Sequence, residues 1–118
     1  MVKPITVVEL GPFLRQAAKI WREEEQSAFV EHIAFNPEDG VVIPDTGGIR
    51  KIRWSRTGSG KRGGVRVVYF YYNPEMPLYL ISMYAKAERE DISPDEKRNM
   101  VDFVTALKRK HRVKGVQS

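Results

Sequence analysis

The chain has 118 residues, 42% of them hydrophobic, and a formal net charge of +5; these values suit one globular domain spanning residues 1–118. It contains no cysteine, which excludes disulfides, cysteine-ligated zinc and thiolate catalysis. No apolar run approaches the roughly 18 residues of a membrane span, and the N-terminus lacks the long apolar segment of a signal peptide. We therefore expect a cytoplasmic protein with no membrane contact.

The N-terminal third reads as a short strand followed by two helices. Residues 5–8 are apolar enough for a strand, and a Gly-Pro pair interrupts the chain soon after them. Apolar residues at helical spacing predict a helix over 13–21. A second helix is expected over 23–35, because its glutamate-rich start complements the positive end of the helix dipole and Pro37 disfavours helix just before it.

Three strands and a last helix follow. Alternating, β-branched and aromatic residues predict strands over 49–55, 64–72 and 78–86. The third of these is the most apolar, which suits a central strand. Ser93, Pro94 and Glu96 form a capping box that starts a helix, and the basic tail, about 108–118, is expected to be frayed or extended. The predicted fold class is α+β, with N-terminal helices packed on a small antiparallel sheet and a C-terminal helix.

Positive charge is concentrated in one block. Residues 46–74 hold seven Lys or Arg and no Asp or Glu, whereas residues 1–45 hold four against eight. Such a block is the electrostatic footprint expected for a polyanion. Because strand side chains alternate between faces, Lys51 and Arg53 share one face of their strand and Arg50 lies on the other.

Cations on the next two strands extend this surface. Arg66 lies among valines, where it serves either a structural ion pair or one wall of a cationic pocket. Lys86 ends the third strand and can join the same face. Cations that hold phosphates, beside tyrosines that stack on bases, suit single-stranded RNA.

Other chemistries find little support in the sequence. His32 lies among apolar helix residues and His111 in the basic tail, so neither indicates a metal site or a histidine-based nuclease. Residues 58–61 (GSGK) lack the spacing of a phosphate-binding loop, and Arg62 stands where Ser or Thr would hold magnesium. The carboxylates show no informative pairing, so a two-metal nuclease is not favoured. We expect no metal and no cofactor.

Four stretches carry a resemblance to a known family: TGGIRKIRW, GKRGGVRVVYFYY, LYLISMYAKAEREDIS and PDEKRNMVDFV. Together they resemble the RelE/HigB toxins of type II toxin–antitoxin modules, in particular the HigB-like branch, over roughly residues 36–104. The resemblance implies a RelE/ParE-like domain and a ribosome-dependent mRNA endonuclease, or mRNA interferase, that inhibits translation. It implies metal-independent attack by the RNA 2′-hydroxyl, with basic side chains stabilising the transition state.

The resemblance also implies partners. These are the message in the ribosomal A site, ribosomal RNA, and a cognate HigA-like helix-turn-helix antitoxin. Operator DNA is bound only through the toxin–antitoxin complex.

The family's catalytic cations can be carried over residue by residue. The motif K-I-[KR] falls on Lys51 and Arg53, the motif G-x-R on Arg66, and the lysine after the last strand on Lys86. The arginine that follows this lysine in RelE falls on Ala87, so the chain departs from RelE there. RelE's late tyrosine has no clear counterpart, and the identity of the general acid stays open. Contacts with message or ribosomal RNA are expected from Arg50, Arg56, Lys61, Arg62 and Tyr84.

Two other functions stay open at this point. A non-enzymatic nucleic-acid-binding module would explain the charge equally well. A ParE-like toxin acting on DNA gyrase would share the implied fold, although such chains usually lack the strand cations.

Overall fold

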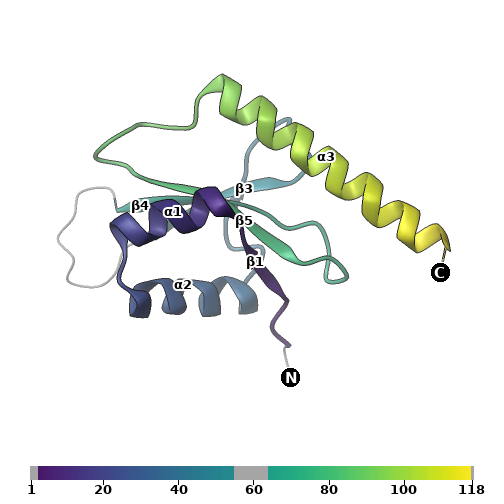
Figure 1. Ribbon diagram of the computed structural model, residues 1–118, viewed down its shortest axis with the longest axis horizontal. Coiled ribbons are helices and arrows are strands. Elements are labelled where there is room, and N and C mark those ends of the chain that lie inside the picture. The colour runs from purple at the N-terminus through teal and green to yellow at the C-terminus, as the bar shows by residue number, and fades with distance from the viewer. Residues whose placement is uncertain (1–2, 55–63, 118) are drawn as a thin grey trace.

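The computed structural model describes residues 3–54 and 64–117, which form three helices and a five-stranded sheet (Figure 1). The helices are α1 (Gly11–Ile20), α2 (Glu23–Phe35) and α3 (Pro94–Gln117). The strands are β1 (Val7–Glu9), β2 (Val41–Val42), β3 (Ile49–Trp54), β4 (Val65–Phe70) and β5 (Leu78–Ala85). The predicted α+β class is confirmed. No helix within the two described ranges is long and apolar enough to cross a membrane.

The sheet has the strand order β1-β5-β4-β3-β2. Its three longer strands, β3, β4 and β5, pair antiparallel as predicted, and β5 has a neighbour on both sides. The two edges differ from the prediction. β1 pairs with β5 in parallel, so the sheet is mixed, and β2 adds an unpredicted strand beside β3. The strand expected over residues 5–8 is present as β1, shifted by one to two residues, but its parallel pairing has no local signal. The two-residue β2 is too short for a period-two pattern to appear in the sequence.

Each face of the sheet carries its own apolar core. On the first, which we call the α1/α2 face, both N-terminal helices pack on the strands through a cluster of buried residues: Phe13, Ala17, Phe29, Ile33, Ile52, Val65, Val67, Tyr69, Leu78, Leu80 and Met83. On the second, the α3 face, the last helix packs through another cluster: Ile49, Val68, Phe70, Met76, Ile81, Tyr84, Met100 and Val104. These two clusters assign every strand residue to a face by alternation.

A bulge interrupts the pairing of β4 with β5. Val68 pairs with Ser82 and the next residue, Tyr69, pairs with Leu80, so Ile81 has no partner in the register. An extra residue of this kind shifts the alternation of a strand. Accordingly Leu80 and Met83, three residues apart, both lie in the core of the α1/α2 face.

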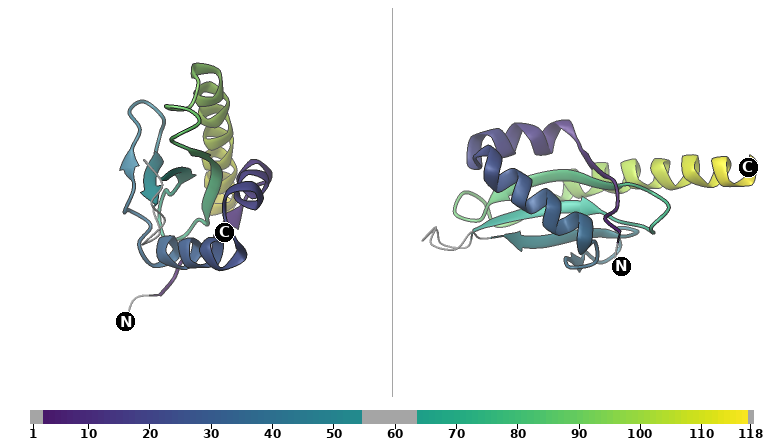
Figure 2. Two further views of the ribbon diagram at one scale, coloured as in Figure 1. Left: turned by 90° about the vertical axis from the view of Figure 1, so that its left-hand side faces the viewer. Right: turned by 90° about the horizontal axis from the view of Figure 1, so that it is seen from below.

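The start of α3 confirms the predicted capping box. The backbone N–H of Glu96 donates to Ser93 Oγ at 3.1 Å, and the N–H of Ser93 donates to Glu96 Oε1 at 2.8 Å. The prediction of a frayed or extended tail is wrong, because α3 continues to Gln117 and runs past the strands (Figure 2). No proline follows Pro94, and cations near a helix C-terminus are favoured by the helix dipole.

Candidate functional site

A row of three polar side chains crosses the α3 face of the sheet. Arg53 of β3, Arg66 of β4 and Tyr84 of β5 are successive partners in the strand register. Arg53 is exposed and Arg66 half-buried. The register thus places two guanidinium groups side by side on one face of the sheet. Guanidinium groups form strong charge-assisted hydrogen bonds with phosphate oxygens, so this arrangement suits an anion.

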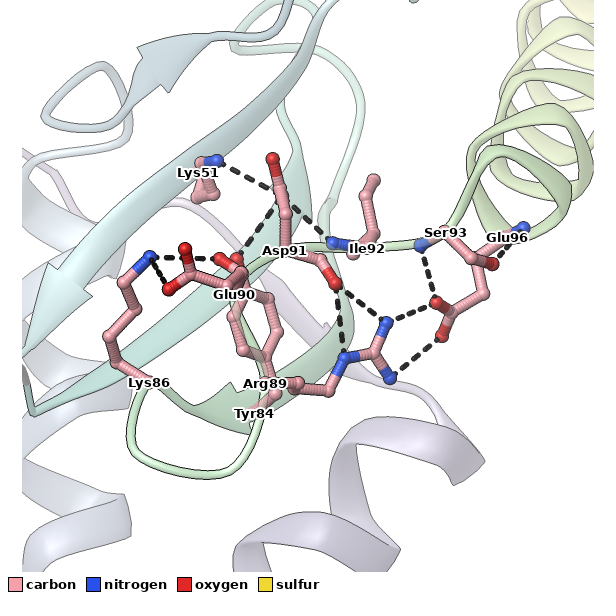
Figure 3. Close-up of polar contacts among 9 residues, drawn as sticks. All are labelled: Lys51, Tyr84, Lys86, Arg89, Glu90, Asp91, Ile92, Ser93 and Glu96. Atoms are coloured by element: carbon pink, nitrogen blue, oxygen red, sulfur yellow. Dashed lines mark hydrogen bonds and ion pairs between the residues drawn. The ribbon is translucent and has the colours of Figure 1, made fainter.

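Lys51 lies on the same face, because it precedes Arg53 by two residues in β3. Its ammonium nitrogen is 3.2 Å from Asp91 Oδ1 (Figure 3). The same carboxylate oxygen accepts a hydrogen bond from the Tyr84 hydroxyl at 3.3 Å and one from the Ile92 N–H at 2.8 Å. Asp91 therefore joins β3 and β5 to the segment that leads into α3.

The environment of Asp91 and Tyr84 fixes their protonation. Partial burial raises the pKa of the Asp91 carboxyl, but the hydrogen bonds from the Ile92 N–H and Lys51 outweigh it, so this pKa lies below its usual value. Burial, together with the charge and hydrogen bond of Asp91, raises the pKa of Tyr84 from 10.0 to about 12, against the opposing effect of Arg66. At neutral pH Asp91 is thus ionised and Tyr84 is a neutral hydrogen-bond donor.

Segment 86–93, the β5–α3 loop, supplies further cations. Arg89 donates from Nε and Nη2 to the backbone oxygen of Asp91 and pairs with Glu96. Its guanidinium carbon lies 5.2 Å from the centre of the Tyr84 ring. Lys86 Nζ is 3.4 Å from Glu90 Oε1. As Figure 3 shows, Lys51, Lys86 and Arg89 each have a carboxylate from this loop or the start of α3.

The predicted site residues do not all lie together. Lys51, Arg53, Arg66 and Tyr84 share the α3 face. Lys86 follows β5, where its N–H donates to the backbone oxygen of Gly64 at 3.1 Å, just before β4. Three residues expected to contact RNA lie outside the described residues: Arg56, Lys61 and Arg62.

Arg50 lies on the opposite face from the other predicted cations. It alternates with Lys51 in β3, and its neighbour in alternation, Ile52, belongs to the core of the α1/α2 face. Its Nη1 donates to the backbone oxygens of Glu38 at 3.0 Å and Gly40 at 2.7 Å. Arg50 thus holds the segment before β2 against the sheet, as Tyr69 does by donating to the Pro37 oxygen and accepting from the Gly40 N–H.

Sequence reasoning did not find Arg89 and Asp91. Both belong to the run EREDIS, whose charges read as ordinary surface charges because neither their partners nor the course of the loop is visible in the sequence. The one available signal was the departure at Ala87: a chain that lacks a cation at one position of a basic site can provide it nearby. Arg89, two residues later, stacks on Tyr84.

The arrangement suits a phosphate better than a metal ion. Among residues 3–54 and 64–117, no group of three or more His, Asp or Glu side chains gathers in a way that could hold a metal ion. Cations on a fixed sheet can instead stabilise negative charge on phosphate oxygens. A polar pocket of about 250 Å³ lies beside Tyr84 and Arg89, with α1 on one side of it. It has room for a polar group adjacent to the phosphate.

Comparison with known families agrees with this geometry. The chain matches the family described as the RelE toxin of the RelE/RelB toxin–antitoxin system over residues 15–114, which includes every residue of the site described above. Toxins of this family are generally endonucleases that inhibit translation. The match covers most of the chain and coincides with a sheet face that displays cations. The protein therefore belongs to the RelE family of type II toxin–antitoxin toxins.

Proposed function

We propose that this protein is a ribosome-dependent mRNA endonuclease of the HigB-like branch, active without a metal. The observation that carries the proposal is the row Arg53–Arg66–Tyr84, flanked by Lys51, on one face of the sheet. This row gathers two guanidinium groups and a tyrosine hydroxyl where a single phosphate could contact all three. Such an arrangement stabilises a transition state that carries added negative charge on its phosphate oxygens.

The proposed reaction is the one that the family resemblance implies. The 2′-hydroxyl of the nucleotide before the cleavage point attacks the adjacent phosphorus, a new O–P bond forms, and the bond to the 5′-oxygen breaks. The products are a 2′,3′-cyclic phosphate and a 5′-hydroxyl. The 2′-hydroxyl gives up its proton and the leaving oxygen gains one. Arg66 stabilises the transition-state phosphate, and Lys51 or Arg53 lies near the nucleophile and scissile phosphate.

Proton donation to the leaving oxygen can come from Lys86 or Tyr84. Tyr84 has a pKa of about 12, so at neutral pH it holds its proton and is suited to donate a hydrogen bond rather than to act as a base. The site contains no histidine, since His32 instead pairs with Asp39 at 2.8 Å and packs against Trp54 on the other face. Holding the 2′-hydroxyl in line with the breaking bond supplies much of the remaining acceleration.

The proposal includes the partners. The substrate is message in the ribosomal A site, with ribosomal RNA as a further contact, and the protein acts in the cytoplasm. A HigA-like helix-turn-helix antitoxin neutralises the toxin, and the complex of the two binds operator DNA. Because the α3 face is cationic, an antitoxin segment that covers it should carry carboxylates there.

Primer extension on a message in a translation extract tests the proposal. The wild-type protein should cut the message only while ribosomes translate it. Arg66→Gln should lower the cleavage rate by about 100- to 1,000-fold, as expected when one electrostatic donor to a transition state is removed. Arg98→Gln is the matched control, because it removes the same group from an exposed position on α3 where it pairs with Asp95; it should cleave normally.

Circular dichroism must show that both variants fold. An intact message in the presence of wild-type protein, with translation unimpaired, would contradict the proposal. Cleavage by Arg66→Gln at the wild-type rate would show that the arginine row takes no part in the reaction. Inhibition of gyrase supercoiling by the wild type would instead support a ParE-like activity.

A further inference from the structure

The second half of α3 is cationic to a degree that the site on the sheet does not explain. Asp102 is the last acidic residue of the chain, and the sixteen residues after it include five Lys or Arg. Residues 108–112, which we call the basic arm, read Lys-Arg-Lys-His-Arg and are helical throughout. Arg109, Lys110 and Arg112 are exposed.

The basic arm leaves the body of the protein at a defined point. Val104 is buried in the core of the α3 face, and Leu107 packs at its border. The next residue, Lys108, places its ammonium 4.9 Å from the centre of the Tyr72 ring and 5.9 Å from that of Phe70. Beyond this contact the helix extends past the sheet, as Figure 1 and the right-hand view of Figure 2 both show.

The cations cover about half of the helix circumference instead of one narrow stripe. At 3.6 residues per turn, Lys108, Arg112, Arg109 and Lys110 are spread over about 200° of the helix circumference. A helical segment with no apolar stripe gains no stability from packing on its own chain. Lys108 and Arg112, four residues apart on the helix, also repel each other. An external polyanion would remove this repulsion.

We propose that the basic arm is a second nucleic-acid contact, which lies against the phosphates of double-helical RNA. A helix with one narrow cationic stripe could contact the phosphates of one strand only. Cations over half of the helix circumference can reach phosphates of both strands of a duplex. Tyr72, half exposed and stacked on Phe70, lies where the arm begins and offers a ring to a base or sugar of the duplex.

This surface is separate from the reaction site and goes beyond the proposed cleavage activity. Arg66 lies near the start of β4, whereas Tyr72 follows its end, so about 20 Å of strand separates the two at 3.3 Å per residue. The arm would hold the toxin on structured RNA, such as that of the ribosome, while the sheet acts on the message. Binding by the arm should therefore persist when the reaction site is disabled.

Fluorescence anisotropy with a labelled 20-base-pair RNA duplex, without ribosomes, tests the inference across a salt series. The test variant is Arg109→Gln/Lys110→Gln/Arg112→Gln, since glutamine keeps the helix propensity. The slope of log K against log salt should fall in magnitude by about 2 to 3, because each lost phosphate contact removes about 0.7–0.9. Affinity at about 0.1 M salt should fall at least about tenfold.

The control removes the same net charge from exposed positions elsewhere: Lys3→Gln/Lys19→Gln/Arg98→Gln. It should bind the duplex with nearly the wild-type slope. If both triple variants lost the same affinity for the duplex, the effect would come from net charge alone, and the inference would be overturned. An equal loss of affinity of the arm variant for the duplex and for a single strand of the same length would also overturn it. The duplex assay contains no ribosomes and measures binding alone, so a wild type that binds the duplex through the arm but leaves the message intact would overturn the proposed cleavage and not the arm.

Discussion

Asp91→Asn separates two roles for the one carboxylate at the centre of the site. Asp91 holds Lys51 in the absence of RNA, yet an RNA phosphate needs the same ammonium. If Asp91 is only a competing anion, its removal should strengthen binding of the message. If it takes the proton from the 2′-hydroxyl, its removal should abolish cleavage.

The structure sets the size of the expected effect. The Lys51 and Asp91 side chains are 32% and 57% exposed, so solvent screening limits their pair to within about 1 kcal/mol of folding stability. A phosphate bound to Lys51 would lie about 6 Å from the carboxylate, where repulsion at an effective dielectric constant of about 55 is about 1 kcal/mol. Relief of that repulsion corresponds to about fivefold tighter binding. Asparagine keeps an oxygen that can accept from Tyr84 and the Ile92 N–H.

Single-turnover cleavage of message on programmed ribosomes, over a range of toxin concentrations, measures both quantities. For Asp91→Asn we expect the half-saturating toxin concentration to fall about fivefold and the limiting rate to stay within about twofold of wild type. Asp102→Asn, which removes one exposed carboxylate from α3, is the control and should change neither. A drop of 100-fold or more in the limiting rate would refute the reasoning and make Asp91 a catalytic base.

The remaining predictions concern stability. Burial raises the pKa of both Tyr69 and Tyr84 from 10.0 to about 12, so the unfolded chain ionises first. The free energy of unfolding should be unaffected below pH 10 and fall between pH 10 and 12, by up to about 3 kcal/mol per tyrosine. Guanidinium titrations at pH 9 and 11 with equal midpoints would contradict this. Ser93→Ala removes the cap of α3 and should cost about 1 kcal/mol, or about 4 °C in Tm. Ser27→Ala, at an exposed position in α2, should show no such loss by differential scanning calorimetry.

Most of the fold could be predicted from the sequence because the patterns that mark its longer strands and helices lie within a few neighbouring residues. Alternation in β3 correctly separated Lys51 and Arg53 from Arg50, and the capping box correctly started α3. The parallel pairing of β1 depends on contacts between residues some seventy positions apart, for which a three-residue strand carries no pattern. The two exposed valines of β2 likewise form a strand only because β3 lies beside them.

The sequence could predict which cations of the candidate site share a sheet face, but not which side chains they contact. Arg66 was expected to face the same way as Lys51, and the register places it directly opposite Arg53. The carboxylate that Lys51 contacts comes from Asp91, forty residues later, and only the path of the β5–α3 loop brings it there. The continuation of α3 was missed because a run of cations without apolar residues gives no helical period, although the helix dipole favours it.

The bulge in β5 has a consequence for how this protein tolerates change in chain length. Ile81, the residue without a partner, lets Leu80 and Met83 face α1 and α2 while Tyr79 and Tyr84 face α3. Loss of Ile81 would remove the bulge and restore strict alternation, with Leu80 and Met83 still toward α1 and α2 and Tyr84 still opposite Arg66. The bulge thus gives β5 one residue that it can lose without turning the side chains of the site. Deletion of Ile81 should therefore be tolerated far better than deletion of Val67 in β4, where every residue is paired and Arg66 would turn to the other face.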